Sequence, residues 1–260
     1  MQPITLSATR LKEIAALKLK KHRQKYDKFL AEGEKISLES IHTAPHLVQT
    51  LIATQSWWDI HYTKLRDRGI QTLIATEDQM KKLSALANPP AVMLIMNPPE
   101  IPENLYSSAT TFILCDDIQD PGNLGTIVRI ADWFGIDAVL CSIGCVDLYN
   151  SKSIQSTMGS FLRVPVVYES IAFYKTKLNT DFAFIAADMK GQDAISFDWP
   201  EKTVLVIGNE GHGLGKEARE ICSETISIMK APGSSAESLN AAISAGILCA
   251  LMTSRKMRGI

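Results

Sequence analysis

The stretch ISIMKAPGSSAESLNAAISAGILC, residues 226–249, is the most informative for the fold. A short β-branched run ends in a Pro-Gly loop, and a helix of small apolar residues is predicted from about 236 to 254. Such a strand–loop–helix junction exposes main-chain N–H and C=O groups, which can cradle a nucleoside without particular side chains. The stretch therefore predicts an α/β architecture with a ligand site built largely from backbone.

The sequence upstream of this junction alternates strictly between apolar strands and helices. The predicted strands lie at 111–117, 138–142, 164–168, 182–188, 203–208 and 225–229. The predicted helices lie at about 123–134, 150–160, 171–178, 213–221 and 236–254. Near-continuous apolar strands separated by helices indicate a parallel sheet covered on both faces. We therefore predict an α/β domain over residues 108–260.

The first part of the chain, residues 1–107, is predicted to be a smaller α/β domain. Its predicted helices are Ser7–Leu30, capped by Ser7, then 46–54, and a short helix that begins near Glu77. The predicted strands are 72–76 and 91–96, and residues 57–62 form an amphipathic or strand-like patch. Because prolines punctuate the end of this region, we interpret 97–108 as an interdomain linker.

Length and composition bound the class of protein. The 260 residues are 46% apolar, which is enough for a substantial core and for two domains. A net charge of −1 excludes a globally basic nucleic-acid binder. Basic residues nevertheless gather near the N-terminus, and such an excess suits a phosphate backbone, although a solvated helix face gives the same pattern. The candidate RNA contacts are Lys18, Lys20, Lys21, Arg23 and Lys25.

The cysteines and the hydropathy argue for a soluble cytoplasmic protein. The five cysteines are scattered, and the close pair Cys141 and Cys145 has no second pair or nearby histidine to complete a zinc site. We therefore expect free thiols in a reducing compartment and no bound metal. The N-terminus lacks an apolar signal core, and the longest apolar stretch, 241–252, is too short to span a bilayer.

A first motif, DDIQDPGNLGTIVRIADWFG, occupies residues 116–135. Asn123 follows an Asp-Pro-Gly turn and is predicted to cap the next helix, which Gly135 closes. Arg129 lies off the apolar stripe of this helix and is either an ordinary exposed arginine or a fixed cation at the carboxyl edge of the sheet. Four residues at helical spacing form the predicted stripe: Leu124, Ile127, Ala131 and Phe134.

A second motif, VLVIGNEGHGL, occupies residues 204–214. Its three glycines allow a tight turn and a close approach of backbone to a ligand, and Glu210 is held at the end of the strand. His212 is interpreted as a loop histidine. The glycine-rich turn comes late in the domain rather than after its first strand, and it lacks both G-x-G-x-x-G and a phosphate-loop lysine. A dinucleotide-binding fold is therefore disfavoured.

The third motif is the junction quoted first. Ser234 and Glu237 fit an S-x-x-E capping box, which is a purely structural role. Ser238 and Asn240 follow, and their side chains are predicted to point towards a bound ligand. Leu239 and Ile228 offer backbone groups and an apolar wall for an adenine ring.

Together these segments resemble the SpoU (TrmH-like) branch of the SPOUT RNA methyltransferases. The family pattern is D-x-x-x-D-P-x-N-x-G-x-x-x-R, then G-x-E-G-x-G, then I-P-M followed by S-L-N. The resemblance covers roughly 111–252, and the chain lacks the proline of the third motif because Met229 follows Ile228 directly. The residues that match the pattern are Asp120, Pro121, Asn123, Gly125, Arg129, Gly208, Glu210, Gly211, Gly213, Ile228, Ser238, Leu239 and Asn240.

The resemblance implies a fold and a reaction beyond what the composition shows. It implies a C-terminal α/β knot with a deep trefoil, an exception to the rule of unknotted chains, and an N-terminal domain similar to the ribosomal L30e fold. It also implies a homodimer that pairs through the C-terminal domain, with the active site near the dimer interface. The implied reaction is methylation of a ribose 2′-hydroxyl in rRNA or tRNA. We favour 23S rRNA, because the N-terminal domain resembles a ribosomal-protein fold.

The resemblance also implies roles for particular residues. The methyl donor would be S-adenosylmethionine, and its implied contacts are Ile207, Gly208, Gly213, Ile228 and Leu239. The implied catalytic residues are Asn123, Arg129, Glu210, Ser238 and Asn240. Arg129 is expected to bind the target phosphate or to polarise the hydroxyl, since a free arginine is a poor base with a pKa above about 12. The other four are expected to position Arg129, the ribose and the loop.

Two alternatives from other classes stay open at this point. One is an RNA-binding protein with a degenerate donor site that performs no chemistry, which binding of S-adenosylmethionine would contradict. The other is a nucleotide-dependent oxidoreductase on a Rossmann-like sheet, which the missing fingerprint disfavours.

Overall fold

The computed structural model describes residues 3–178 and 181–258. Contacts within the chain define two compact units. Unit 1 holds the described residues up to Pro99 together with Asp147–Leu162, and unit 2 holds Glu100–Val146 and the described residues from Arg163 onwards. A sequence-based division at 107/108 does not anticipate that Asp147–Leu162 belongs to unit 1.

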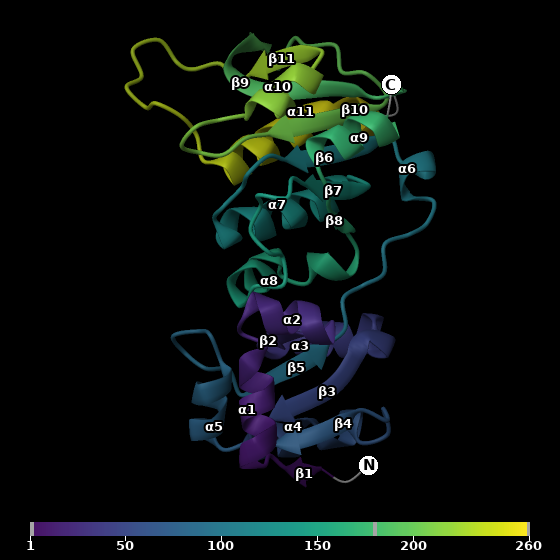
Figure 1. Ribbon diagram of the computed structural model, residues 1–260, viewed down its shortest axis with the longest axis vertical. Coiled ribbons are helices and arrows are strands. Elements are labelled where there is room, and N and C mark those ends of the chain that lie inside the picture. Colours follow the sequence, from purple (N-terminus) through teal and green to yellow (C-terminus); the bar gives the residue numbers. More distant parts are fainter. Residues whose placement is uncertain (1–2, 179–180, 259–260) are drawn as a thin grey trace. The chain divides into compact units, whose positions relative to one another are not determined.

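Unit 2 is built on a six-stranded sheet in which every neighbouring pair is parallel, as the apolar strand pattern predicts. The strand order is β11-β9-β10-β6-β7-β8 (Figure 1). The first three strands along the chain are β6 (Thr111–Cys115), β7 (Ala138–Cys141) and β8 (Val166–Tyr168). The other three are β9 (Ala183–Asp193), β10 (Thr203–Ile207) and β11 (Glu224–Ser227).

Helices cover the sheet of unit 2. They are α6 (Leu105–Ser108), α7 (Pro121–Phe134), α9 (Ile171–Leu178), α10 (Lys216–Ile221) and α11 (Ala241–Arg258). Phe112 and Val204 belong to a buried cluster with Tyr174 of α9 and Ala218 of α10. The neighbouring strand residues Ile113 and Leu205 are also fully buried, although they point the opposite way, so apolar side chains are covered on both faces. Helices α7 and α11 pack against each other.

Unit 1 contains a five-stranded mixed sheet in the order β1-β4-β3-β5-β2. Its strands are β1 (Ile4–Thr5), β2 (Phe29–Glu32), β3 (Val48–Ala53), β4 (Gln71–Ile74) and β5 (Val92–Met96). Strands β1, β4 and β3 run parallel, whereas β5 is antiparallel to both β3 and β2. The sheet therefore differs in kind from the all-parallel sheet of unit 2.

The helices of unit 1 pack on this mixed sheet. The α-helices are α1 (Ala8–Ala16), α2 (Lys20–Tyr26), α3 (Glu34–Thr43), α4 (Gln55–Leu65), α5 (Glu77–Leu83) and α8 (Ser151–Thr157). Two 3₁₀ turns, η1 (Pro45–Leu47) and η2 (Ser160–Leu162), complete the unit. Ile14 of α1 and Met80 of α5 meet Ile52 and Leu73 of the sheet in one buried cluster. This core gives the first half its own stability.

The single helix predicted over Ser7–Leu30 is wrong. Ser7 does cap α1, because its side chain accepts a hydrogen bond from Arg10 N–H, but that helix ends before Leu19, whose backbone is extended. Helix α2 then ends at Asp27 in a left-handed conformation, and Phe29 starts a fully buried strand. Burying this apolar run in the sheet outweighs the helix propensity of the lysine-rich sequence.

The helix predicted over 46–54 is also wrong, because these residues form η1 and the strand β3. Strand β3 lies between β4 and β5, and its residues from Thr50 to Ala53 are fully buried. The patch at 57–62, which could be read as a strand, is part of α4, with Thr54 capping the helix through Trp57 N–H. The predicted strands at 72–76 and 91–96 and the helix from Glu77 are confirmed.

Two predicted helix caps are displaced in unit 2. Asp120, rather than Asn123, caps α7 by accepting a hydrogen bond from Asn123 N–H at 2.9 Å. Asn240 replaces the predicted Ser234–Glu237 capping box, because its Oδ1 accepts from the N–H groups of Ala242 and Ile243. The final helix consequently begins at Ala241. The first shift leaves the Asn123 side chain available for other contacts.

A buried ion pair fastens Asp147–Leu162 into unit 1. The Arg23 guanidinium lies 2.6 Å from Asp147 Oδ2, and the two side chains are 8% and 16% exposed. Arg23 Nη1 also donates to the carbonyls of Leu17 and Lys18, at 2.9 and 2.7 Å. These partners occupy the guanidinium, so its burial favours a structural role for Arg23 over the predicted phosphate contact.

Replacing Asp147 with alanine should lower the free energy of unfolding by about 3 kcal/mol, because it leaves the Arg23 charge buried and unpaired. Urea denaturation followed by circular dichroism measures this change. Glu13→Ala is the matched control, since it removes an ion pair with Arg10 in which both side chains are largely exposed, and it should change stability little. If the urea midpoints of Asp147→Ala and Glu13→Ala were equal, the ion pair between Arg23 and Asp147 would not anchor the segment 147–162.

Two further features bear on function. No helix within residues 3–178 and 181–258 is both long and apolar enough to cross a bilayer. The same residues contain no cluster of three or more histidine, cysteine or acidic side chains arranged to hold a metal. Strand order does not report on threading, so the trefoil knot stays a prediction, as does the likeness of unit 1 to L30e.

Candidate functional site

The candidate site lies at the carboxyl edge of the parallel sheet in unit 2. The strands β6, β10 and β11 end at Cys115, Ile207 and Ser227, and the loops that follow them carry the three sequence motifs. Parallel strands have their carboxyl ends at one edge, which is where open α/β sheets bind ligands. The topology therefore gathers segments that lie about a hundred residues apart in the sequence.

Three predicted residues, one from each motif, form a hydrogen-bonded chain at this edge. The side-chain amide of Asn240 donates to Asn123 Oδ1 at 2.9 Å, and the amide of Asn123 donates to Glu210 Oε1. Asn123 can make both bonds because Asp120 caps α7 in its place. Its side chain thus couples the loop after β10 to the start of α11.

Arg129 lies on an exposed part of α7, off the buried stripe, as predicted. Leu124, Ile127 and Ala131 of the stripe are fully buried, whereas Phe134 is only partly so. Within residues 3–178 and 181–258, the Arg129 guanidinium has no ion-pair or hydrogen-bond partner. A fixed helix carries it, and its charge is therefore available to an anionic group.

The glycine-rich turn after β10 closes on itself. The N–H and C=O groups of Asn209 and Gly213 bond to each other at 2.9 and 3.1 Å, and Gly213 has a left-handed φ of 68°. A side chain at Gly208 would meet the carbonyl carbon of Gly213 at 2.5 Å and the nitrogen of Leu214 at 2.6 Å. Glycine at 208 is therefore required for this closed turn, which presents Glu210 to Asn123.

Asp117 joins this turn to the loops after β6 and β7, and sequence reasoning missed it. Its carbonyl accepts from the Asn209 amide at 2.8 Å, and His212 Nε2 lies 3.1 Å from its Oδ2. Its N–H donates to Ser142 Oγ at 2.9 Å, and its φ of 56° is left-handed. Asp tolerates this conformation better than most residues, but no sequence pattern marks the position.

An ion pair fixes the far end of the glycine-rich turn. Arg219 of α10 donates from Nε to the Leu214 carbonyl at 3.0 Å and from Nη1 to Asp188 Oδ2 at 2.9 Å. Burial raises the pKa of Asp188, but hydrogen bonds from Lys190 N–H and from Arg219 outweigh it, so the net pKa is lowered. The resulting stabilisation is present above the unfolded pKa and is lost as the pH falls through the folded pKa.

The loop from Ile228 to Asn240 leaves the sheet without regular structure. Figure 1 shows it as the long segment that projects between β11 and α11. Ile228 is partly buried, whereas every residue from Met229 to Asn240 is exposed. The structure thus brings Asn240 to the other motifs, while Leu239 is 47% exposed and Ser238 makes no hydrogen bond within the described residues.

The backbone of this loop suits a ligand recognised through main-chain groups. Between Met229 and Ser238, the N–H groups of Ser234 and Ala236 bond within the loop. The other main-chain N–H groups of that stretch have no partner among residues 3–178 and 181–258. With the closed turn at Gly208, these groups fit an adenine-containing cofactor, which amide edges can bind.

The predicted RNA contacts lie in unit 1. Lys20, Lys21 and Lys25 are exposed on α2, where their charges face solvent. Lys18 is partly buried, and its Nζ donates to the carbonyls of Lys82 and Ser84 at 2.7 Å each. The exposed lysines therefore suit phosphate contacts, whereas Lys18 ties down the chain after α5.

Comparison with known proteins decides the family. The profile of the SpoU rRNA Methylase family matches residues 110–250, which is more than half of the chain. The chain belongs to the SpoU rRNA methylase family. Residues 8–94 of this SpoU methylase match the MRM3-like substrate binding domain. The family resemblance predicted from the three motifs is confirmed. The match favours this family over the alternative of a Rossmann-type oxidoreductase.

Relatives of this SpoU methylase span nearly its whole length. The 23S rRNA (guanosine(2553)-2′-O)-methyltransferase RlmP of Bacillus subtilis is 30% identical over 241 residues, which are 92% of this chain and 94% of the relative. The S-adenosylmethionine-bound rRNA methyltransferase from Sinorhizobium meliloti has a TM-score of 0.83 at 27% identity, with 98% of each chain covered.

A third relative carries the cofactor as well. The SpoU methyltransferase AviRb of Streptomyces viridochromogenes, in complex with S-adenosylmethionine, has a TM-score of 0.82 at 27% identity. The comparison covers 97% of this chain and 99% of AviRb. Both units of this SpoU methylase therefore have counterparts in solved structures.

Proposed function

We propose that this chain transfers a methyl group from S-adenosylmethionine to a ribose 2′-hydroxyl of ribosomal RNA, with 23S rRNA the favoured substrate and tRNA the second candidate. The observation that supports this proposal most directly is the hydrogen-bonded chain from Glu210 through Asn123 to Asn240, which joins all three family motifs at one edge of the sheet. The named activities of RlmP and of the Sinorhizobium methyltransferase support the reaction and the substrate class.

The donor would be held by the loops after β10 and β11. Ile207, Gly208 and Gly213 form the closed turn, and Ile228 and Leu239 flank the loop whose amide groups lack protein partners. When bound, S-adenosylmethionine supplies an electrophilic methyl group. The residues of the chain bind it through main-chain groups and exclude water from the side of the buried Ile207.

The acceptor would be oriented by side chains around Arg129. A 2′-hydroxyl is a weak nucleophile, so alignment and electrostatic help with loss of its proton account for most of the rate. Arg129 holds the target phosphate or polarises the hydroxyl, because its guanidinium is exposed and carries a permanent charge. Asn123, Glu210 and Asn240 hold the loops in place, and together with Ser238 they position Arg129 and the ribose.

Unit 1 would hold structured RNA, and unit 2 would pair with a second copy of the chain. The exposed Lys20, Lys21 and Lys25 support phosphate contacts, which make the affinity fall as salt rises. Trp133 of α7 and Ile243 of α11 are 81% and 57% exposed, and two exposed large apolar side chains on helices that pack against each other support a homodimer interface. The free thiols support a cytoplasmic location.

Asp117 offers a test of the donor site that leaves the catalytic residues intact. Asp117→Gly keeps the left-handed backbone but removes the carboxylate beside His212, so it should weaken S-adenosylmethionine binding about tenfold by loosening the turn. Asp117→Asn tolerates the same φ and keeps a side-chain acceptor, so its affinity should stay within about twofold of wild type. Calorimetric titration measures both, and equal losses would contradict the turn-holding role.

The reaction itself is tested by incubating the full chain with labelled S-adenosylmethionine and an unmodified 23S rRNA transcript, and then mapping 2′-O-methylated positions. Methylation at a defined ribose supports the proposal, and a tRNA transcript in parallel separates the two candidate substrates. Binding of RNA without binding of the donor would instead support the non-catalytic alternative.

A further inference from the structure

Residues 147–162 form a segment that the sequence profile and the folded structure assign to different halves of the protein. They connect β7 to β8 and lie inside the stretch that matches the SpoU profile, yet they belong to unit 1. Besides the Arg23–Asp147 pair, Gln155 Nε2 donates to the Glu32 carbonyl at 2.7 Å. The ring of Phe29 packs against Tyr149 and Phe161, with centroids 4.6 and 5.6 Å away. The segment is thus an integral part of the RNA-binding unit.

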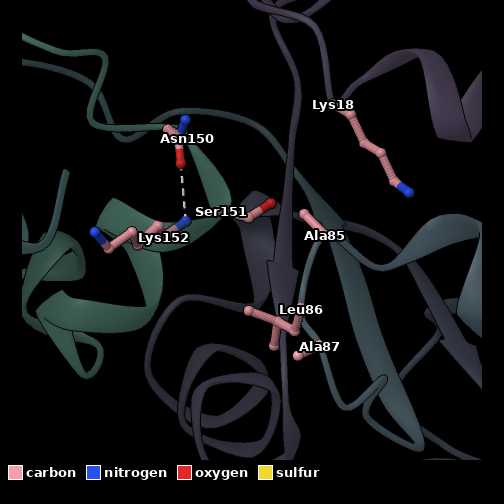
Figure 2. Close-up of a pocket in the computed structure, with 7 residues that line it drawn as sticks. All are labelled: Lys18, Ala85, Leu86, Ala87, Asn150, Ser151 and Lys152. Atoms are coloured by element: carbon pink, nitrogen blue, oxygen red, sulfur yellow. Dashed lines mark hydrogen bonds between the residues drawn. The ribbon is translucent and has the colours of Figure 1, made fainter.

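The segment completes a hollow in unit 1 with a volume of about 300 Å³. Three pieces of chain line it: the turn after α1 with Lys18, the loop after α5, and the start of α8 (Figure 2). The complete lining is Lys18, Ala85, Leu86, Ala87, Asn150, Ser151 and Lys152. In the view of Figure 2, Lys18 and Lys152 lie on either side of Leu86. Ala85, Leu86 and Ala87 therefore give the hollow an apolar lining between two lysines, whose side chains extend outward in this view.

The walls of the hollow are held rigidly. Glu32 is 1% exposed, and its carboxylate accepts hydrogen bonds from the Ser84 hydroxyl and from Ala85 N–H. Lys18 fixes the same loop through the carbonyls of Lys82 and Ser84, which use two of the three hydrogens of its ammonium. On the opposite side, Asn150 Oδ1 caps α8 by accepting from Lys152 N–H at 2.9 Å. A preformed hollow of this kind binds without a large ordering cost.

The chemistry of the lining matches the backbone of RNA. Lys18 and the exposed Lys152 line the hollow, and the exposed Lys20 and Lys21 follow Lys18 along the chain, so the segments that form the hollow carry an excess of positive charge. RNA presents phosphates to such charges and 2′-hydroxyls to polar groups like the Ser151 side chain. The apolar Leu86 can meet the face of a ribose or base. A protein partner would more commonly be met by aromatic side chains, and none lines this hollow.

We propose that the hollow between Lys18 and Lys152 binds the sugar–phosphate backbone of the RNA substrate, with Lys152, a residue from the SpoU half of the sequence, as a phosphate contact. This rests on the proposed function. The RNA surface of unit 1 is accordingly composite, so residues 1–107 alone form an incomplete RNA-binding domain. The basic residues of α2 then have two different roles. Arg23 holds the segment 147–162 through its ion pair with Asp147, and the exposed lysines bind RNA.

The test compares two charge reversals in the full chain. Lys152→Glu should weaken binding of an unmodified 23S rRNA transcript about tenfold and lower the slope of log affinity against log salt by about one. Lys64→Glu makes the same charge change on α4, at an exposed lysine outside the hollow, and should alter affinity less than about twofold. Calorimetric binding of S-adenosylmethionine should be unchanged in both variants, which checks their folding.

The outcomes separate this inference from the proposed function. If wild type binds and methylates the transcript while Lys152→Glu shows wild-type affinity and salt slope, the composite surface is wrong and the function stands. Equal losses for Lys152→Glu and Lys64→Glu would show a general charge effect, which also overturns the inference. If wild type neither binds nor methylates the 23S rRNA or the tRNA transcript, the proposed function and this inference fail together.

Discussion

Arg129→Ala should reduce methyl transfer about a thousandfold while leaving the affinity for S-adenosylmethionine within about threefold of wild type. Arg129 is exposed on α7, and in the proposed reaction its guanidinium acts on the acceptor; removing one preorganised charge from a reacting group commonly costs a factor of this size. The donor contacts lie on other loops, so they should be spared. Single-turnover transfer to 23S rRNA and calorimetric titration of the donor measure the two quantities.

Arg129→Lys separates charge from geometry in the same experiment. Lysine keeps the positive charge but loses the planar fork of donors, so recovery of less than about a tenth of the wild-type rate indicates that the fork itself holds the phosphate or hydroxyl. A rate for Arg129→Ala close to that of wild type would remove Arg129 from the mechanism, whatever the donor affinity.

Gly208→Ala should lower the affinity for S-adenosylmethionine at least about a hundredfold. The added methyl group would lie 2.5 Å from the Gly213 carbonyl carbon and 2.6 Å from the Leu214 nitrogen, and both are backbone atoms that move only if the turn opens. Opening the turn also displaces Glu210 from Asn123, so the rate should fall with the affinity. Calorimetric titration and single-turnover transfer measure both effects.

Gly211→Ala is the matched control, because it adds the same methyl group three residues further along the turn. There the nearest atom is the Asn209 side-chain oxygen at 3.3 Å, and that contact can relax by a few tenths of an ångström. Its donor affinity should stay within about threefold of wild type. If Gly208→Ala and Gly211→Ala lost similar amounts of donor affinity, the turn would tolerate no added side chain at either position. The prediction that glycine is specifically required at position 208 would then be wrong.

The sequence predicted the structure correctly where local residue preferences agree with the long-range packing. The apolar runs from Thr111 to Ser227 predicted the parallel sheet, because a buried parallel strand needs apolar residues on both faces. The three motifs predicted the family, and the structure brings together one candidate residue from each motif: Asn123, Glu210 and Asn240. Gly135 was predictable as a helix terminus, since its left-handed φ of 66° favours glycine.

Predictions of secondary structure from the sequence were wrong where burial in the tertiary structure overrides the local preference for helix. Phe29–Glu32 and Val48–Ala53 have helical neighbours on the chain, yet both become strands, because the sheet of unit 1 fully buries Phe29–Glu32 and the residues from Thr50 to Ala53. The helix caps at Asp120 and Asn240 could not be chosen from several polar candidates, since the choice depends on which side chain the rest of the site engages.

What the sequence by itself determined is therefore the α/β class, the family and the set of candidate residues for the site. Only the tertiary structure decided that Asp117 joins three loops, that Arg23 is buried against Asp147, and that a segment from the SpoU half completes unit 1. The physical reason is distance along the chain. Periodicity and motifs report on neighbours a few residues apart, whereas these contacts join positions up to 124 residues apart and form only when each unit folds.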